Sequence, residues 1–96
     1  LNNTIVISGS TDYIISNNQI SEVFDGSSLM TKVTGMGCTA TAIIGACIAV
    51  ESDYHLASNV AMKIMGKAGN YAEEKSNGPG SFQMNFLDML YNLKVL

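Results

Sequence analysis

The sequence predicts an α/β fold in which short strands come first and helices follow. Residues 1–34 hold short apolar runs separated by Asn, Ser and Gly, whereas apolar residues from Thr39 onward recur at helical spacing. The first run and the first helical stretch are both apolar on every side, so they need more neighbours than 96 residues supply. We therefore expect a partial domain of a larger layered α/β structure, with a strand and hairpin region over 1–34 and a glycine loop and helices over 35–96.

The strand region contains several distinct elements. Residues 5–7 (IVI) form a continuous apolar run, which predicts a strand buried on both faces, as in parallel sheets. The runs at 13–15 and 19–24 predict a β-hairpin, because the intervening Asn17 and Asn18 tolerate the left-handed conformation of a tight turn. A turn is expected at residues 25–28 and another strand at residues 30–33.

Three helices are expected after the glycine pair. The first, over residues 39–50, is apolar nearly all round, which predicts burial on all sides. The second spans residues 56–75, and its predicted apolar stripe is Val60, Ile64, Ala68, Tyr71 and Ala72. The third begins near Ser81 after Gly78 to Gly80, and its predicted stripe is Phe82, Phe86, Leu90 and Leu93.

Composition excludes several classes of function. The net charge is −3 and the only basic side chains are five scattered lysines, so no basic stripe is available for nucleic acid. The longest apolar run, at residues 42–50, is about half of what a membrane span needs. Cys38 and Cys47 would lie roughly 13 Å apart on one helix, too far for a disulfide, so a reducing, cytoplasmic location is expected.

The segment of residues 33–39 (VTGMGCT) carries the chemistry. Gly35 and Gly37 let the backbone turn and bring N–H groups close to a ligand, and the helix that follows points its unpaired N–H groups at the same place. Such a helix start is an anion-binding arrangement, and Cys38 lies at its edge. We therefore expect phosphate chemistry. The structural alternative is a glycine turn that only caps a buried helix.

Two separate motifs make the sequence resemble the hydroxyethylthiazole kinase family. One is residues 29–38 (LMTKVTGMGC), continued by residues 45–51, and the other is residues 78–88 (GPGSFQMNFLD). Residues 7–13 (ISGSTDY) also match the strand and turn that precede this region in the family. The resemblance covers essentially the whole chain, but only the C-terminal part of the family's longer pattern. It implies the C-terminal part of a ribokinase-like layered α/β fold.

The resemblance also implies an activity. Family members transfer the γ-phosphoryl group of ATP to the hydroxyl of 4-methyl-5-(2-hydroxyethyl)thiazole in thiamine salvage, using magnesium. They form homotrimers with active sites at subunit boundaries. Their N-terminal portion supplies further ATP, substrate and metal contacts, so that portion is an expected partner of this chain. The family's acidic metal ligands lie in it as well, and no metal ligand is therefore assigned among residues 1–96.

Residue roles follow from the same resemblance. Gly35 corresponds to the substrate-contacting glycine, and Gly35, Gly37 and Cys38 together form the expected anion hole. Cys38 stands where many related kinases have an aspartate base. Since a thiol beside phosphate is a poor base, we expect Cys38 to position the substrate hydroxyl. Ser8 takes the place of a hydroxyl residue that contacts ATP. Met36 departs from the family's usual threonine, which removes a hydroxyl but keeps the backbone amide.

Other readings stay open on the sequence alone. The chain is either the C-terminal part of a kinase or a non-catalytic assembly fragment that docks on an N-terminal partner or on copies of itself. An independent nucleotide-binding module is disfavoured, because the elements cannot cover one another. Cys47 is expected to be packed, and His55, the only histidine, is expected to be solvated at a helix start without a catalytic partner.

Overall fold

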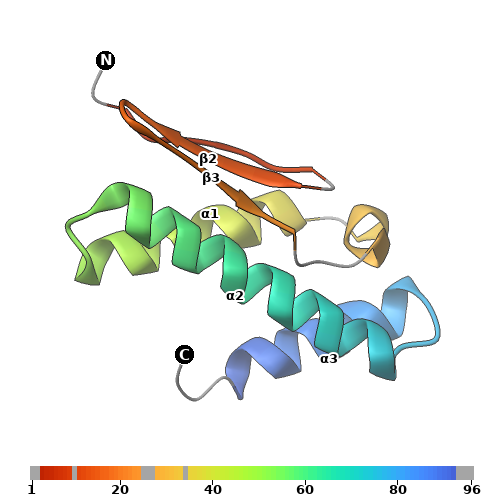
Figure 1. Cartoon of the computed structure of the whole chain (residues 1–96). Helices are drawn as coiled ribbons and strands as arrows, with labels where there is room; N and C mark the ends of the chain where they lie inside the picture. The colour runs from red at the N-terminus through yellow and green to blue at the C-terminus, as the bar shows by residue number, and fades with distance from the viewer. Residues whose placement is uncertain (1–2, 10, 25–27, 34, 93–96) are drawn as a thin grey trace.

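The computed structural model describes residues 3–9, 11–24, 28–33 and 35–92. In chain order its elements are β1 (Ile5–Ile7), β2 (Asp12–Ser16), β3 (Gln19–Val23), the 3₁₀-helix η1 (Ser28–Lys32), α1 (Met36–Val50), α2 (Tyr54–Lys75) and α3 (Pro79–Tyr91). The sheet lies on one side of the helices, with α2 running across the middle of the molecule (Figure 1). The predicted α/β class, with strands followed by three helices, is confirmed.

The three strands form an antiparallel sheet in the order β1-β2-β3. Ile15 of β2 lies opposite Ile5 of β1 on one side and Ile20 of β3 on the other. Asn17 and Asn18 form the loop between β2 and β3, which confirms the predicted hairpin. The left-handed conformation expected for the two asparagines is wrong, however, because neither of them has a positive φ in the structure.

β1 differs from its prediction. It pairs with β2 in antiparallel fashion and has no strand on its other side within the described residues, so it is an edge strand. Ile5 and Ile7 are 52% and 50% exposed, and only Val6 packs toward the core. The expectation of a strand buried on both faces is therefore wrong for this chain, because none of the described residues covers the outer face of the sheet.

The segment before the glycine loop is also not a strand. Residues 28–32 form the 3₁₀-helix η1, where a strand was expected at residues 30–33. Leu29, Met30 and Val33 pack against the core cluster around Phe82 and Phe86, and this tertiary contact overrides the local β-propensity. Residues 25–27 of the expected preceding turn lie outside the described residues.

Helix α2 supplies most of the core. Asp53 caps its N-terminus by accepting hydrogen bonds from the backbone N–H groups of His55 (3.1 Å) and Leu56 (3.2 Å). One buried cluster contains Met65, Ala68, Ala72, Phe82 and Phe86, and the other contains Ile14, Val23 and Met62. The expected apolar stripe of α2 is correct at Ala68 and Ala72, whereas Tyr71 is exposed. Small side chains on α2 let its neighbours approach closely from several sides.

Helix α3 closes the second half of α2. It begins at Pro79, two residues before the expected start, because proline is well suited to the first turn of a helix. Phe82 and Phe86 are fully buried with ring centroids 5.8 Å apart, as their stripe predicts. The Asn85 amide donates to Lys75 O (3.2 Å), which ties α3 to the end of α2. Leu93 lies outside the described residues.

Helix α1 starts earlier and is less covered than expected. It begins at Met36, three residues before Thr39, so Gly37 and Cys38 belong to its first turn. None of its residues is buried, and the prediction of burial on all sides is wrong for this chain. Ala40, Ile43 and Ile44 are partly covered by α2, α3 and the sheet, while the opposite face of α1 has no neighbour in the described part of the chain.

No described helix combines the length and the apolar character that crossing a bilayer requires.

Candidate functional site

Gly35 is the residue on which the glycine loop turns. It precedes α1 as the N-cap, with φ 93° and ψ 4°, a left-handed conformation that side chains rarely adopt. Its carbonyl accepts from both the backbone N–H (3.0 Å) and the hydroxyl (3.1 Å) of Thr39. The chain thereby turns into α1 at the single residue Gly35, and this turn positions the first amides of the helix.

The first turn of α1 is open. Met36, Gly37 and Cys38 are its first three residues, whose N–H groups have no partner within a helix. No side chain caps this end, unlike the Asp53 cap on α2. Apart from the chain neighbours and the backbone of α1 itself, no described atom lies within 4 Å of where a Cβ on Gly35 or Gly37 would be, so a ligand can approach the backbone. The amides and the positive end of the helix dipole favour an anion there.

Cys38 completes this turn as an exposed, free thiol. It therefore lies beside the amides that would meet an anion and is accessible to a small molecule. The hydroxyl of nearby Thr41 donates to Gly37 O (3.0 Å), so its proton is used within α1 and does not face an anion at the helix start. The structure thus places Gly35, Gly37 and Cys38 together at the start of α1, where the sequence analysis expects a loop ahead of a helix that begins at Thr39.

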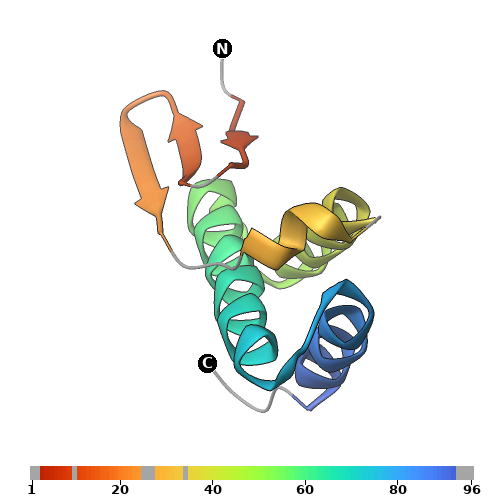
Figure 2. The same ribbon diagram turned by 90° about the vertical axis from the view of Figure 1, so that its right-hand side faces the viewer.

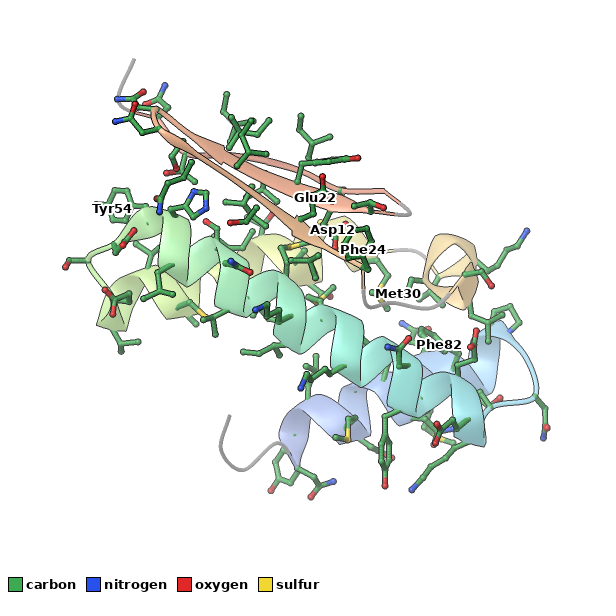
Figure 3. All side chains as sticks on the ribbon, viewed as in Figure 1. Asp12, Glu22, Phe24, Met30, Tyr54 and Phe82 are labelled. Carbon is green, nitrogen blue, oxygen red and sulfur yellow. The ribbon has the colours of Figure 1, made fainter. Side chains whose placement is uncertain are left out.

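Ser8 belongs to a separate turn. It follows β1 directly and is exposed. The next residue, Gly9, donates its N–H to Asp12 Oδ1 (3.1 Å), which holds the turn against the start of β2. Burial raises the pKa of the Asp12 carboxyl, and the Gly9 hydrogen bond lowers it in part. Figure 3 shows Asp12 on the side of the sheet that faces the helices.

His55 is the residue that sequence reasoning misjudged. It is only 6% exposed, and its Nδ1 and Nε2 atoms hydrogen-bond Ser16 Oγ and Ser21 Oγ, each at 2.8 Å. Ser16 Oγ also contacts Thr4 Oγ1 at 3.0 Å. The expected solvated histidine is therefore a buried link between α2 and both strands of the hairpin. One feature of the sequence could have indicated this link: Ser16 and Ser21 both fall at inward-facing positions of the hairpin strands.

A cavity of about 490 Å³ opens beside His55, where Figure 3 labels Tyr54. Thr4, the hairpin loop and the start of α2 line it, and its lining includes no residue of the glycine loop. Among the described residues, no group of three or more His, Cys, Asp or Glu side chains could hold a metal ion.

Comparisons with known proteins identify the chain's relatives. The model of the hydroxyethylthiazole kinase family matches residues 1–95. A hydroxyethylthiazole kinase of Leptospira biflexa is 51% identical over 91 residues, which is 95% of this chain and 34% of that protein. One from Syntrophus aciditrophicus is 53% identical over 90 residues, or 94% of this chain and 33% of that protein. The chain thus spans about a third of the length of these curated relatives.

The structural comparison agrees with the sequence comparisons. A solved hydroxyethylthiazole kinase from Pyrococcus horikoshii superposes with a TM-score of 0.91 at 33% identity, covering 98% of this chain and 37% of that structure. Both the strands and the three helices of this chain therefore occur in an enzyme of that name. Since the family model extends over nearly every residue, the chain belongs to the hydroxyethylthiazole kinase family.

Proposed function

We propose that this chain forms the glycine-loop part of an ATP-dependent kinase that phosphorylates the hydroxyl of 4-methyl-5-(2-hydroxyethyl)thiazole in thiamine salvage. Family membership and the relatives' names support the activity. The observation that carries it is the open first turn of α1 behind the left-handed Gly35. Because the chain spans about a third of its relatives, the remaining portion of the kinase is its necessary partner.

The chemistry assigns a task to each residue. The substrate hydroxyl attacks the γ-phosphorus, the bond from that phosphorus to the bridging oxygen of ADP breaks, and the hydroxyl loses its proton. Backbone amides at Gly35, Gly37 and Cys38 would stabilise the charge that spreads over the transferring phosphoryl oxygens. Gly35 would also contact the thiazole substrate, and the Ser8 hydroxyl would contact ATP. No residue of this chain is assigned to magnesium, because the described residues contain no group of three or more His, Cys, Asp or Glu side chains that could hold a metal ion.

The test joins this chain to the portion of the Leptospira biflexa kinase that it does not match. The joined protein should convert the thiazole alcohol to its phosphate ester when ATP is supplied, as measured by mass spectrometry of the product. The matched control replaces Gly35 by Ala, which moves the amides by disturbing a positive-φ turn. A folded joined protein that consumes no thiazole alcohol would contradict the proposed activity.

Cys38→Ala in the joined protein separates positioning from proton abstraction. If Cys38 only orients the substrate hydroxyl, kcat should fall only modestly, whereas general-base help is worth about 10² to 10⁴ in rate. Because Cys38 is exposed at the helix start, its replacement should leave the fold intact, and circular dichroism checks this. A loss of kcat beyond 10⁴ would show that the thiol carries more of the chemistry than positioning.

Assembly and location are parts of the same proposal. The family resemblance supports a homotrimer, and two free cysteines support a reducing, cytoplasmic setting.

The alternative, a non-catalytic docking fragment, is favoured by one observation, the uncovered apolar faces of α1 and the sheet. Intact mass and sedimentation of the purified material decide: three kinase copies, each including an N-terminal companion, support the enzyme, and this chain alone supports the fragment.

A further inference from the structure

Asn77 is the one asparagine in the sequence that is followed by glycine, and every other asparagine precedes a larger residue. Because glycine has no Cβ, the backbone nitrogen of Gly78 can approach the side chain of the preceding residue without steric hindrance. Attack of this nitrogen on the side-chain amide is the general route by which asparagine loses ammonia. The pair of Asn77 and Gly78 is therefore the place in the chain where this reaction is least hindered.

The pair lies in the link between α2 and α3, which protrudes at one end of the molecule (Figure 1). Figure 2 shows α3 beside the half of α2 that lies away from the sheet, so the strands do not cover this link. The side chain of Asn77 is exposed and has no hydrogen bond to any described residue. Its carboxamide is therefore accessible to water and is not held in place by a partner.

The Gly78 nitrogen is available as the nucleophile. Its N–H group donates no hydrogen bond within the described part of the chain, whereas the N–H group of Asn77 donates to Ser81 Oγ (3.0 Å). The backbone of Gly78 is extended, with φ 176°, and a Cβ there would meet no described atom within 4 Å apart from its chain neighbours. The position therefore needs glycine neither for its backbone angles nor for space, and alanine can replace it to test the reaction.

Two nearby asparagines differ from Asn77 in both respects. The Asn85 amide donates to Lys75 O (3.2 Å), and the Asn92 amide donates to Asp88 O (2.8 Å). Each of them precedes a large apolar residue instead of glycine. They are therefore internal comparisons for the reactivity of Asn77.

We propose that Asn77 is a site of spontaneous deamidation, which converts its carboxamide to a carboxylate with water as the co-reactant. The Gly78 nitrogen loses its proton to base and bonds to Cγ of Asn77, while the bond from Cγ to the side-chain nitrogen breaks and ammonia leaves. Water then opens the cyclic succinimide, giving aspartate when it adds at Cγ and isoaspartate when it adds at the main-chain carbonyl carbon. One carboxamide and one water thus become one carboxylate and one ammonium ion, and nothing is oxidised or reduced.

The two products act differently on α3. Aspartate adds a negative charge just ahead of a helix start that has no acidic residue in its first turn and no side-chain cap, which favours the helix. Isoaspartate lengthens the main chain by one carbon before Gly78, whose carbonyl accepts from Phe82 N–H (2.9 Å). Phe82 is fully buried, and Met36 of the glycine loop packs against the cluster that contains it. Isoaspartate at residue 77 therefore disturbs the packing beneath the glycine loop, whereas aspartate does not.

The experiment incubates the joined protein in mildly alkaline buffer and follows the conversion by peptide mass spectrometry. Cleavage after lysine gives a peptide of residues 76–94, which contains Asn77 together with its internal comparisons Asn85 and Asn92. The mass of this peptide should rise with time by the difference between a carboxylic acid and a carboxamide, and fragment ions should place the change at Asn77. A sample digested without incubation corrects for conversion during digestion.

Two variants identify the reacting groups. Gly78→Ala keeps the asparagine but places a methyl group beside the attacking nitrogen, so conversion at Asn77 should slow roughly tenfold or more. Asn77→Gln keeps a carboxamide but requires a larger ring, so residue 77 should gain no mass over the same time. Circular dichroism checks that both variants fold like the wild type.

Three results would each overturn the proposal. One is an Asn77 that stays unchanged in the folded protein over the time in which the urea-unfolded protein converts. The second is conversion of Asn85 or Asn92 as fast as Asn77, and the third is conversion of Gly78→Ala at the wild-type rate. The comparison among the asparagines is made within one wild-type peptide, so it decides the question even where a variant does not fold. None of these measurements depends on kinase activity.

Discussion

At the scale of single residues, Gly35 and Gly37 look alike in the sequence and differ in the structure. Gly35 has φ 93°, whereas Gly37 lies in the helix with ordinary backbone angles. Neither would bring a Cβ into contact with another atom, so backbone preference alone separates them. Gly35→Ala should lower the free energy of unfolding by about 1–2 kcal/mol. Gly37→Ala should raise it by up to about 1 kcal/mol, as measured by urea unfolding.

Each variant is the control for the other, because both substitutions add one methyl group at an exposed position at the start of α1. Equal effects of the two variants would show that the left-handed turn is not maintained in solution. The sequence could identify both glycines as functional candidates. It could not say which of them required glycine for its φ, since helix α1 begins three residues earlier than the periodicity of its apolar residues indicates.

Asp12 gives the chain a pH dependence that the sequence did not indicate. Burial raises the pKa of its carboxyl, so the folded state keeps the proton to higher pH than the unfolded state does. Stability from this group is therefore lost as pH rises from about 4 through the raised pKa. Asp12→Asn keeps the acceptor for Gly9 N–H and removes the ionisation. It should be more stable than wild type at neutral pH.

The advantage of Asp12→Asn should shrink as the pH falls through the raised pKa and below about 4, where the aspartate becomes protonated in the unfolded state as well. Urea unfolding at a series of pH values measures it. Glu22→Gln provides the control, because Glu22 is an exposed acid in the same sheet. A stability gain that does not vary with pH would show that ionisation of Asp12 is not its cause.

We expect the side chain of His55 to contribute more to the stability of the fold than its neighbours on α2 do. His55→Ala leaves two buried or half-buried serine hydroxyls, on Ser16 and Ser21, without their imidazole partner. Loss of a buried hydrogen-bond partner costs about 1–3 kcal/mol, so the melting temperature should fall clearly. Leu56→Ala alters the adjacent, half-exposed side chain and should have a much smaller effect. Similar losses from both variants would mean that the imidazole adds no more than ordinary packing.

At the scale of elements, α1 and α2 should differ in local stability. α2 has ten buried residues and an Asp53 cap, whereas α1 has no buried residue and no side-chain cap. Segments with few buried contacts open at lower free energy. Amide exchange of the isolated chain should therefore be faster in the middle of α1 than in the middle of α2. Comparable protection in both helices would show that something covers α1 in solution.

The same comparison shows what the sequence could predict about elements. The period of the apolar residues predicted all three helices, and the two apolar runs at 13–15 and 19–24 predicted the hairpin, although its asparagines do not adopt the expected left-handed conformation. The 3₁₀-helix at residues 28–32 was missed because Leu29 and Met30 are held by Phe82 and Phe86, which lie fifty residues further along the chain. Local propensity contains no information about such a contact. Figure 3 shows Met30 and Phe82 at the same end of the molecule.

At the scale of the whole molecule, the sequence predicted that the elements cannot cover all of their apolar surface. It did not predict where the uncovered surface lies. Composition indicated that apolar surface needs covering, and Ile5, Ile7 and the bare face of α1 are that surface. The sequence placed these residues in the interior, since it assumed that neighbours were present. The glycine loop was predictable as a site because its residues are contiguous. The link between Ser16, Ser21 and His55 was not, because it joins positions 34 and 39 residues apart.

The two hydrogen bonds from His55 to Ser16 and Ser21 differ in which partner donates the proton. A neutral imidazole donates from one ring nitrogen and accepts at the other, so one serine must receive a proton while the other gives one. Thr4, Ser16, His55 and Ser21 then form a chain of hydroxyl and imidazole groups, in which either hydroxyl of the Thr4–Ser16 bond can be the donor. Changing the tautomer of His55 reverses the sense of both its bonds together. The segment before β1, the hairpin and α2 thus share two proton arrangements of a single folded structure, distinguishable by the nitrogen chemical shifts of one ring.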